Sequence, residues 1–201
     1  MRNMYDAVTP ANIPANPQMV AGYVNGHYAW TTADWAKFPH AAHVTIDVNG
    51  ARPDADVLDV ENGDATPAGA VQWVKAKLAR KGSYLPILYC NRSTLTPLFN
   101  ALQSAGYTVN EHFRTWVAVP GGDVTLKDMT GVTAIQWKFA GGYDESTVYD
   151  NSFKVAAPPK PPTPPVVSKP TPAPVLKGVL VAVPSGIAKT VTSADNGITW
   201  K

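Results

Sequence analysis

The chain has 201 residues, a formal net charge of +2 at pH 7 and 45% hydrophobic residues, which is typical of one ordinary globular domain with some additional length. Lysine and arginine are scattered rather than clustered, which argues against nucleic-acid binding. No segment is long and apolar enough to span a membrane, and the N-terminus "MRNMYDAVTP" has no apolar signal region, so we expect a protein made in the cytoplasm without a signal peptide and without membrane insertion.

Residues 1–155 alternate between strand-like and helix-like segments. The strand-like segments are rich in β-branched and aromatic residues and are bounded by Gly, Pro, Asn or Asp; in chain order they are 4–8, 20–26, 43–48, 56–61, 85–90, 114–119 and 133–139. The helix-like segments are 31–38, 66–82 and 93–107. Thr66 is the expected N-cap of the second helix and Gly82 its end, and Gly106 ends the third.

Repetition of strand followed by helix predicts an α/β fold with a parallel sheet and helices outside. A complete (β/α) barrel requires at least about 200 residues. We therefore predict a trimmed TIM-like barrel with parallel strands over residues 1–155.

Two acids in one predicted strand give the first indication of function. The stretch "DVLDVENGD" places Asp59 and Glu61 on one face of the strand, with apolar residues on the face toward the helices. A buried carboxylate without a partner is costly. Two acids pointing into a barrel at the carboxyl end of a strand therefore indicate a functional cleft.

Polar and aromatic residues recur at the other strand ends. Carboxylates that hold sugar hydroxyls and rings that stack on sugar faces are typical of a carbohydrate site. The candidate substrate-binding residues are Asp6, Asp47, Tyr89, Trp116, Gln136, Trp137 and Asp150.

Several other reactive residue types receive a structural interpretation. Asp54 and Asp64 lie outside the predicted strand and are expected to cap the next helix or to pair with Arg52. Cys90, the single cysteine, is expected to be a small buried side chain, because no base lies near it in sequence. The histidines lack the spacing of a metal site, and no phosphate-binding glycine motif is present. We expect no metal and no cofactor.

The order of these pieces resembles glycoside hydrolase family 25, the Chalaropsis-type lysozymes, and the related glycoside-hydrolase-like domains of actinobacteria and their phages. The resemblance covers about residues 3–153 and is carried by an early strand Asp, by "LDVENGD" before a helix, by "PILYCN" and "TWVAV", and by a late "QW" and "DNSF". It implies that Glu61 is the proton donor and that Asp59 stabilises the positively charged sugar centre. Asp6 and Asp150 match the flanking acids that position the substrate.

The resemblance implies a phage peptidoglycan-degrading muramidase, either an endolysin or a tail-associated lysin, which acts on the bacterial cell-wall glycan. The alternative is a non-catalytic phage tail or virion structural protein whose glycosidase-like domain binds glycan. For the enzyme, we expect Glu61 to be protonated and Asp59 to be charged near neutral pH.

Composition changes after the predicted barrel. Residues 156–177 form a proline-rich linker, with nine prolines between Ala156 and Pro174. Residues 178–201 form a C-terminal β segment in which "SADNGITW" matches the Asp-box pattern and Asn196-Gly197 predicts a hairpin turn. Because an isolated hairpin is marginally stable, we expect this segment to order on another copy of the chain, on the cell wall or on other phage tail proteins.

Overall fold

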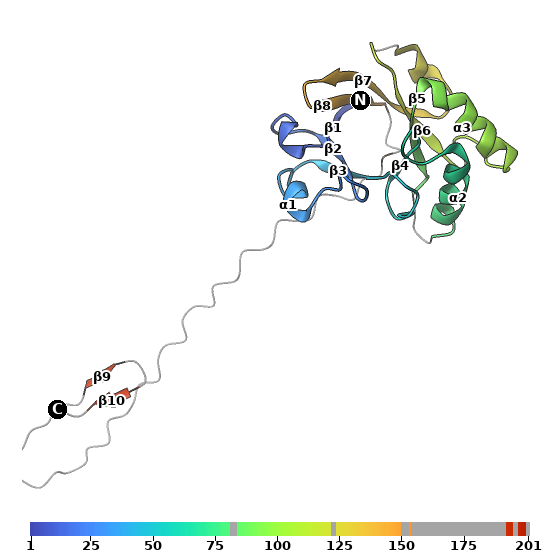
Figure 1. Ribbon diagram of the computed structural model, residues 1–201. Coiled ribbons are helices and arrows are strands. Elements are labelled where there is room, and N and C mark those ends of the chain that lie inside the picture. Colours follow the sequence, from blue (N-terminus) through green and yellow to red (C-terminus); the bar gives the residue numbers. More distant parts are fainter. Residues whose placement is uncertain (81–83, 122–123, 150–152, 154–191, 195–196, 200–201) are drawn as a thin grey trace, which may run out of the picture. The chain divides into compact units, whose positions relative to one another are not determined.

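The computed structural model describes residues 1–80, 84–121, 124–149, 153, 192–194 and 197–199. The chain divides into two compact units, Met1–Pro162 and Thr163–Lys201, and the first contains a closed barrel of eight strands (Figure 1). The strands are β1 (Arg2–Asp6), β2 (Met19–Tyr23), β3 (Ala42–Asp47), β4 (Val57–Asp59), β5 (Ile87–Asn91), β6 (Arg114–Ala118), β7 (Val132–Ala140) and β8 (Tyr143–Val148).

Seven of the strands follow the predicted parallel arrangement, since each strand from β1 to β6 pairs in parallel with the next, up to β7. The eighth strand, β8, is antiparallel to both β7 and β1 and closes the barrel. The prediction of an entirely parallel barrel is therefore wrong for this strand. Its connection to β7 is the pair Gly141 and Gly142, which adopt φ values of 51° and 104°. A two-residue turn joins only antiparallel strands.

Few helices surround the barrel, as expected for a trimmed fold. They are α1 (Thr32–Trp35), α2 (Pro67–Leu78) and α3 (Arg92–Ser104), with 3-10 turns at Pro10–Asn12 and Val124–Asp128. Thr66 caps α2 as predicted, because its Oγ1 accepts a hydrogen bond from the Gly69 amide at 3.1 Å. However, α2 ends at Leu78, ahead of the predicted end at Gly82, which lies outside the described residues.

The third helix agrees more closely with its prediction. Asn91 caps α3 by accepting a hydrogen bond from the Thr94 amide at 2.9 Å. Gly106 follows the end of the helix in the left-handed conformation, with φ at 85°, which is the usual role of glycine at a helix C-terminus.

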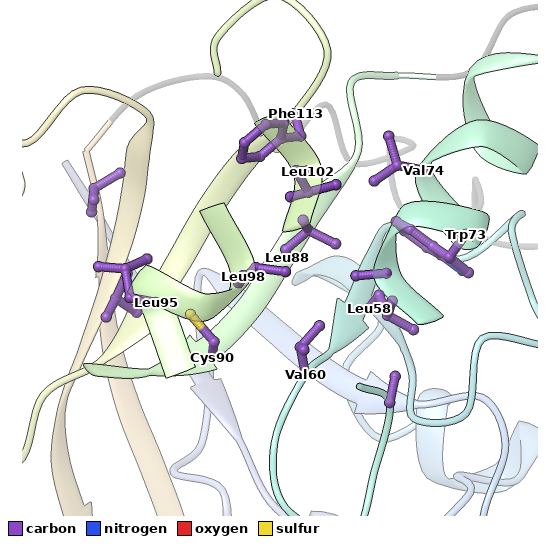
Figure 2. Close-up of a cluster of buried hydrophobic side chains, with 14 of the residues drawn as sticks. Leu58, Val60, Trp73, Val74, Leu88, Cys90, Leu95, Leu98, Leu102 and Phe113 are labelled. Atoms are coloured by element: carbon purple, nitrogen blue, oxygen red, sulfur yellow. The ribbon is translucent and has the colours of Figure 1, made fainter. Parts of the chain in front are cut away.

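The outer face of the barrel packs against two of these helices. Figure 2 shows Leu58 of β4 and Val60, which follows that strand, in one buried cluster with Trp73 of α2 and Leu98 of α3. The helices α2 and α3 contact one another and lie outside the β4–β6 part of the barrel (Figure 1). Cys90 is buried in the same cluster. The prediction for residues 56–61 that Leu58 and Val60 lie on the face toward the helices is therefore confirmed.

A second apolar cluster fills the barrel interior. It includes Met4 of β1, Val57 of β4 and Trp116 of β6, whose Nε1 donates a hydrogen bond to Ser146 Oγ at 3.0 Å. Side chains two residues apart on a strand share a face. Asp6 and Asp59 each follow one of these interior residues by two positions, so they extend the interior face toward the carboxyl ends of their strands.

The described part of the C-terminal unit is a short antiparallel pair, β9 (Thr192–Ala194) and β10 (Gly197–Thr199), with Ala194 opposite Gly197. The predicted hairpin is present, but Gly197 is the first residue of β10 rather than part of the turn. The predicted linker, residues 156–177, lies outside the described residues. Among the residues that the structure does describe, no helix has the length and apolarity required to cross a membrane.

Candidate functional site

A cleft of about 480 Å³ lies at the carboxyl ends of the first four strands. Its lining comes from the segments that follow β1, β2, β3 and β4, and it includes the three acids Asp59, Glu61 and Asp64. This is the end of a parallel barrel at which functional sites are normally built. The structure thus brings the two predicted catalytic residues to one cavity.

Asp59 and Glu61 reach this cleft from different backbone settings. Asp59 is the last residue of β4 and is only 5% exposed, and its Oδ1 has no hydrogen-bond partner within the described structure. Glu61 was predicted to lie within the strand, but β4 ends at Asp59 and the chain then turns, with the Asp64 amide donating to the Glu61 carbonyl at 3.1 Å. Glu61 is therefore on a turn and is half-buried.

Asp6 adds a third buried carboxyl to the interior face. Its side chain is 5% exposed, and Oδ2 has no hydrogen-bond partner among the described residues. Asp144 of β8 lies opposite Asp6 in the antiparallel register and is hydrogen-bonded to Gln136 of β7. Gln136 is itself 1% exposed, so the predicted substrate-binding residues Asp6 and Gln136 belong to one buried polar group at the top of the barrel interior.

Burial raises the pKa of both Asp6 and Asp59, the two acids on the interior face of the barrel. It raises the pKa of Asp6 to about 8, with added repulsion from Asp144 and Glu61. It also raises the pKa of Asp59 to about 8, with added repulsion from Glu61, Asp64 and Asp6. Both groups are therefore mostly protonated at pH 7 in the free protein. The expectation that Asp59 is charged near neutral pH is therefore wrong, because burial and the neighbouring acids raise its pKa above 7.

Burial, neighbouring acids and a hydrogen bond act on the pKa of Glu61 in opposite directions. Burial raises its pKa, and repulsion from Asp64 and Asp144 acts in the same direction, whereas hydrogen bonding to Asn91 lowers it. Asn91 is also the N-cap of α3, so its position is fixed by the helix. A half-buried glutamic acid with a raised pKa and a fixed hydrogen-bond donor is suited to holding a proton and then releasing it.

A second hollow of about 320 Å³ borders the first and shares Glu61, Gly63 and Asp64 with it. The rest of its lining comes from the turn after β4 and from the first residues of α2 and α3, including Thr66 and Ser93. Glu61 thus lies where two hollows meet. A long substrate that occupies both hollows would cross the protein surface at this carboxyl group.

Asp47 does not face the cleft. It is fully buried on the outer side of β3, and its carboxylate accepts hydrogen bonds from Asn25 Nδ2 at 2.7 Å and Trp73 Nε1 at 2.9 Å. Three backbone amides, those of residues 49, 50 and 52, also donate to it. The structure therefore places this predicted substrate-binding residue in a loop-stabilising network.

The predicted aromatic residues divide between the two faces of the barrel. Tyr89 and Trp116 lie inside, with ring centroids 4.7 Å apart and exposures of 9% and 1%. Trp137 packs against the outer, helix-facing cluster. Asp150 lies outside the described residues. None of these three aromatic residues lines the larger cleft.

The cleft contains residues that the sequence interpretation missed. Tyr28 lies in a loop immediately after a predicted strand, where the motif "YVNGHY" offered the only signal. Asp64 was interpreted as a cap or as a partner of Arg52, but Arg52 pairs with Asp54 at 2.8 Å, and Asp64 lines both hollows. The pairing of Arg52 with Asp54 is the arrangement expected from the sequence.

Comparison with known proteins adds no assignment, since no protein-family model, curated protein or solved structure matches the chain. The fold and site define an α/β barrel, mainly of parallel strands, with an acidic cleft at the carboxyl ends of its strands. Within the residues that the structure describes, no group of three or more His, Cys, Asp or Glu side chains has the arrangement of a metal site.

Proposed function

We propose that the chain is a phage muramidase, an endolysin or a tail-associated lysin, that hydrolyses the glycan backbone of the bacterial cell wall. The observation that carries the proposal is the position of Glu61, a carboxyl group with a raised pKa at the meeting point of two hollows. The acids beside it and the resemblance of "LDVENGD" to the lysozyme family support the same conclusion.

In this mechanism, Glu61 gives its proton to the glycosidic oxygen. The bond between that oxygen and the anomeric carbon breaks, and its electron pair stays with the oxygen of the leaving sugar. An ionised Asp59, or the acetamido oxygen of the substrate, stabilises the positive charge that develops at the anomeric carbon. A water molecule then adds to this carbon, and its proton returns to the Glu61 carboxylate. General acid catalysis of this kind contributes on the order of a hundredfold or more to the rate.

Repulsion between Asp59 and Glu61 favours the state in which one of the two carboxyls is ionised and the other is protonated. Stabilisation of the sugar centre by Asp59 requires Asp59 to be ionised while Glu61 holds its proton, and burial raises the pKa of Asp59 to about 8. Repulsion between the two carboxyls means that ionisation of Asp59 raises the affinity of Glu61 for its proton. Hydrolysis that uses Asp59 should therefore be fastest where the pair holds one proton, and its rate should fall at lower pH, where both groups are protonated, and at higher pH, where both are ionised.

The second candidate is a non-catalytic tail or virion protein that holds cell-wall glycan and contacts other tail proteins, or a second copy, through residues 178–201. The protonated state of Asp6 and Asp59 at neutral pH favours this candidate. A neutral carboxyl group both donates and accepts hydrogen bonds, which suits binding of sugar hydroxyls, and a neutral Asp59 provides no counter-charge for the sugar centre.

The two candidates are separated by incubating the full chain with purified bacterial peptidoglycan and measuring new reducing ends and sedimentation with the wall. The enzyme hypothesis predicts that Glu61→Gln abolishes the release of reducing ends and preserves sedimentation. Glu111→Gln, at an exposed glutamate outside the cleft, is the matched control and should behave like the parent. Sedimentation without any release by the parent favours the binding protein, and release at the parental rate by Glu61→Gln contradicts the catalytic role.

A further inference from the structure

The part of the cleft formed by the loops after β2 and β3 carries an exposed aromatic side chain. Tyr28 lines the cleft and is 55% exposed. Its ring meets the His27 ring edge-on, with centroids 4.8 Å apart, and His27 lines the same cleft. Because the two rings are nearly perpendicular and Tyr28 is more than half exposed, a face of the Tyr28 ring is free to pack against the C–H face of a sugar.

Asn49 lines the same part of the cleft and has a fixed orientation. Its Oδ1 accepts hydrogen bonds from the Ala51 backbone amide at 3.1 Å and from Asn25 Nδ2 at 2.7 Å. A backbone amide can only donate, so the Asn49 atom that meets Ala51 must be the oxygen. In the described structure no hydrogen bond uses Asn49 Nδ2, and the residue is exposed. Two N–H donors are therefore available to a ligand in the cleft.

Asn25 connects Asn49 to the buried Asp47 by hydrogen bonds and so fixes the orientation of the Asn49 amide. Its Oδ1 accepts from the Val48 amide at 3.0 Å, and its Nδ2 donates both to Asp47 Oδ1 and to Asn49 Oδ1, each at 2.7 Å. Both ends of the Asn25 amide are thus occupied by the protein. Asp47 is held in turn by backbone amides and by Trp73. Asn25 therefore donates to Asp47 on one side and to Asn49 on the other, and it connects the two residues in a fixed orientation.

We propose that Tyr28 and Asn49 recognise one N-acetylated sugar ring of the glycan, Tyr28 by stacking on the ring and Asn49 by donating from Nδ2 to the acetamido carbonyl oxygen. Asp47 is a positioning residue that acts through Asn25. The carbonyl oxygen of an acetamido group only accepts hydrogen bonds, and the N–H groups of Asn49 Nδ2 can only donate them. This inference rests on the proposed function, because it assigns the recognition of that same substrate.

The test measures binding of soluble peptidoglycan glycan strands to the full chain by titration calorimetry, with Glu61→Gln as the background so that no cleavage occurs. Asn49→Asp retains the oxygen that accepts from Ala51 and Asn25 but removes the donor, and Asn49→Ala removes the donor without adding a charge. Each is expected to raise Kd about 3- to 12-fold, the range for one lost hydrogen bond. Tyr28→Ala should raise Kd by a similar factor, and Tyr28→Phe should bind like the background.

The role of Asp47 is tested by a double-mutant cycle. Asp47→Asn should weaken binding, and the variant that combines it with Asn49→Ala should bind no more weakly than Asn49→Ala alone, because both changes remove the same contact. If Asp47→Asn does not fold, Asn25→Ala replaces it in the cycle, with the same expectation. Additive losses overturn the positioning role.

Two failures have different meanings. If the Glu61→Gln chain and the parent do not bind the glycan strands, the proposed function fails and this inference fails with it. If the background binds the strands and the Asn49 and Tyr28 variants all bind within twofold of it, recognition lies elsewhere in the cleft, and only the inference is overturned.

Discussion

Replacing Asp6 with asparagine is expected to stabilise the protein at neutral and alkaline pH. The pKa of the Asp6 carboxyl is about 8 in the folded protein, compared with its ordinary value of 3.8, because the group is buried beside other acids. The folded state therefore binds more protons than the unfolded state between these two values, so the free energy of unfolding falls as pH rises through this window. Asparagine does not ionise and avoids this loss.

The magnitude follows from the two pKa values. Each pH unit above 3.8, up to about 8, costs the parent about 1.4 kcal/mol, which gives on the order of 4 kcal/mol at pH 7. Asparagine also brings an amide donor to a site where the Asp6 Oδ2 has no partner, at a cost of about 1–3 kcal/mol. The net gain for Asp6→Asn should be about 1–3 kcal/mol at pH 7 and more at pH 8, and near pH 4 it should become a loss of up to about 3 kcal/mol, because only the cost of the amide remains there.

Urea denaturation followed by tryptophan fluorescence, repeated from pH 4 to pH 9, measures this difference. Asp54→Asn is the control, because Asp54 is paired with Arg52 at the surface and its pKa is lowered to about 2; its removal should change stability little, and only in the destabilising direction. An Asp6→Asn variant that is less stable than the parent at pH 8, or a difference that does not depend on pH, refutes the assignment of Asp6 as a buried, protonated acid.

Three further changes test local features. Gly22→Ala should lower the free energy of unfolding by about 1–3 kcal/mol, because the added Cβ would lie 2.5 Å from the Trp30 ring; an unchanged urea midpoint would contradict this packing. Thr66→Ala should cost about 1 kcal/mol by removing the N-cap of α2, and Thr66→Ser should restore it in the same assay. Asp64→Asn should lower the pKa of Glu61 by removing a nearby repulsion, which would move the pH profile of reducing-end release to lower pH; a profile that stays in place or moves upward counts against this coupling.

The parallel part of the barrel could be predicted because its signals are local. Alternation from Leu58 to Val60, at the end of β4 and just after it, places these two residues against the helices and Asp59 inside, and this pattern can be recognised in a single segment of the sequence. The antiparallel β8 also had a local signal, the Gly141–Gly142 pair between two strand-like segments, which is a typical hairpin turn. The predicted strands do not include residues 143–148, which form the closing strand.

The candidate site was less accessible to sequence reasoning because it depends on contacts between distant loops. Asp47 and Asp59 are each the last residue of a strand, but their side chains lie on opposite faces of the barrel. Asp47 therefore binds the amides of a loop, whereas Asp59 lines the cleft. The approach of Asn25 to Asn49 joins loops that follow different strands. The protonation of Asp59 depends on burial by the whole barrel, which spacing along one strand does not reveal.

The most direct test of the central claim is the identity of the sugar at each newly formed end. Purified peptidoglycan is digested with the full chain, the products are reduced with borohydride, and the reduced sugars are identified by mass spectrometry after acid hydrolysis. A muramidase that uses Glu61 as its acid must yield reduced muramic acid with the parent and none with Glu61→Gln. The absence of any reduced amino sugar from the parent digest, or equal amounts from the parent and Glu61→Gln, would contradict the account.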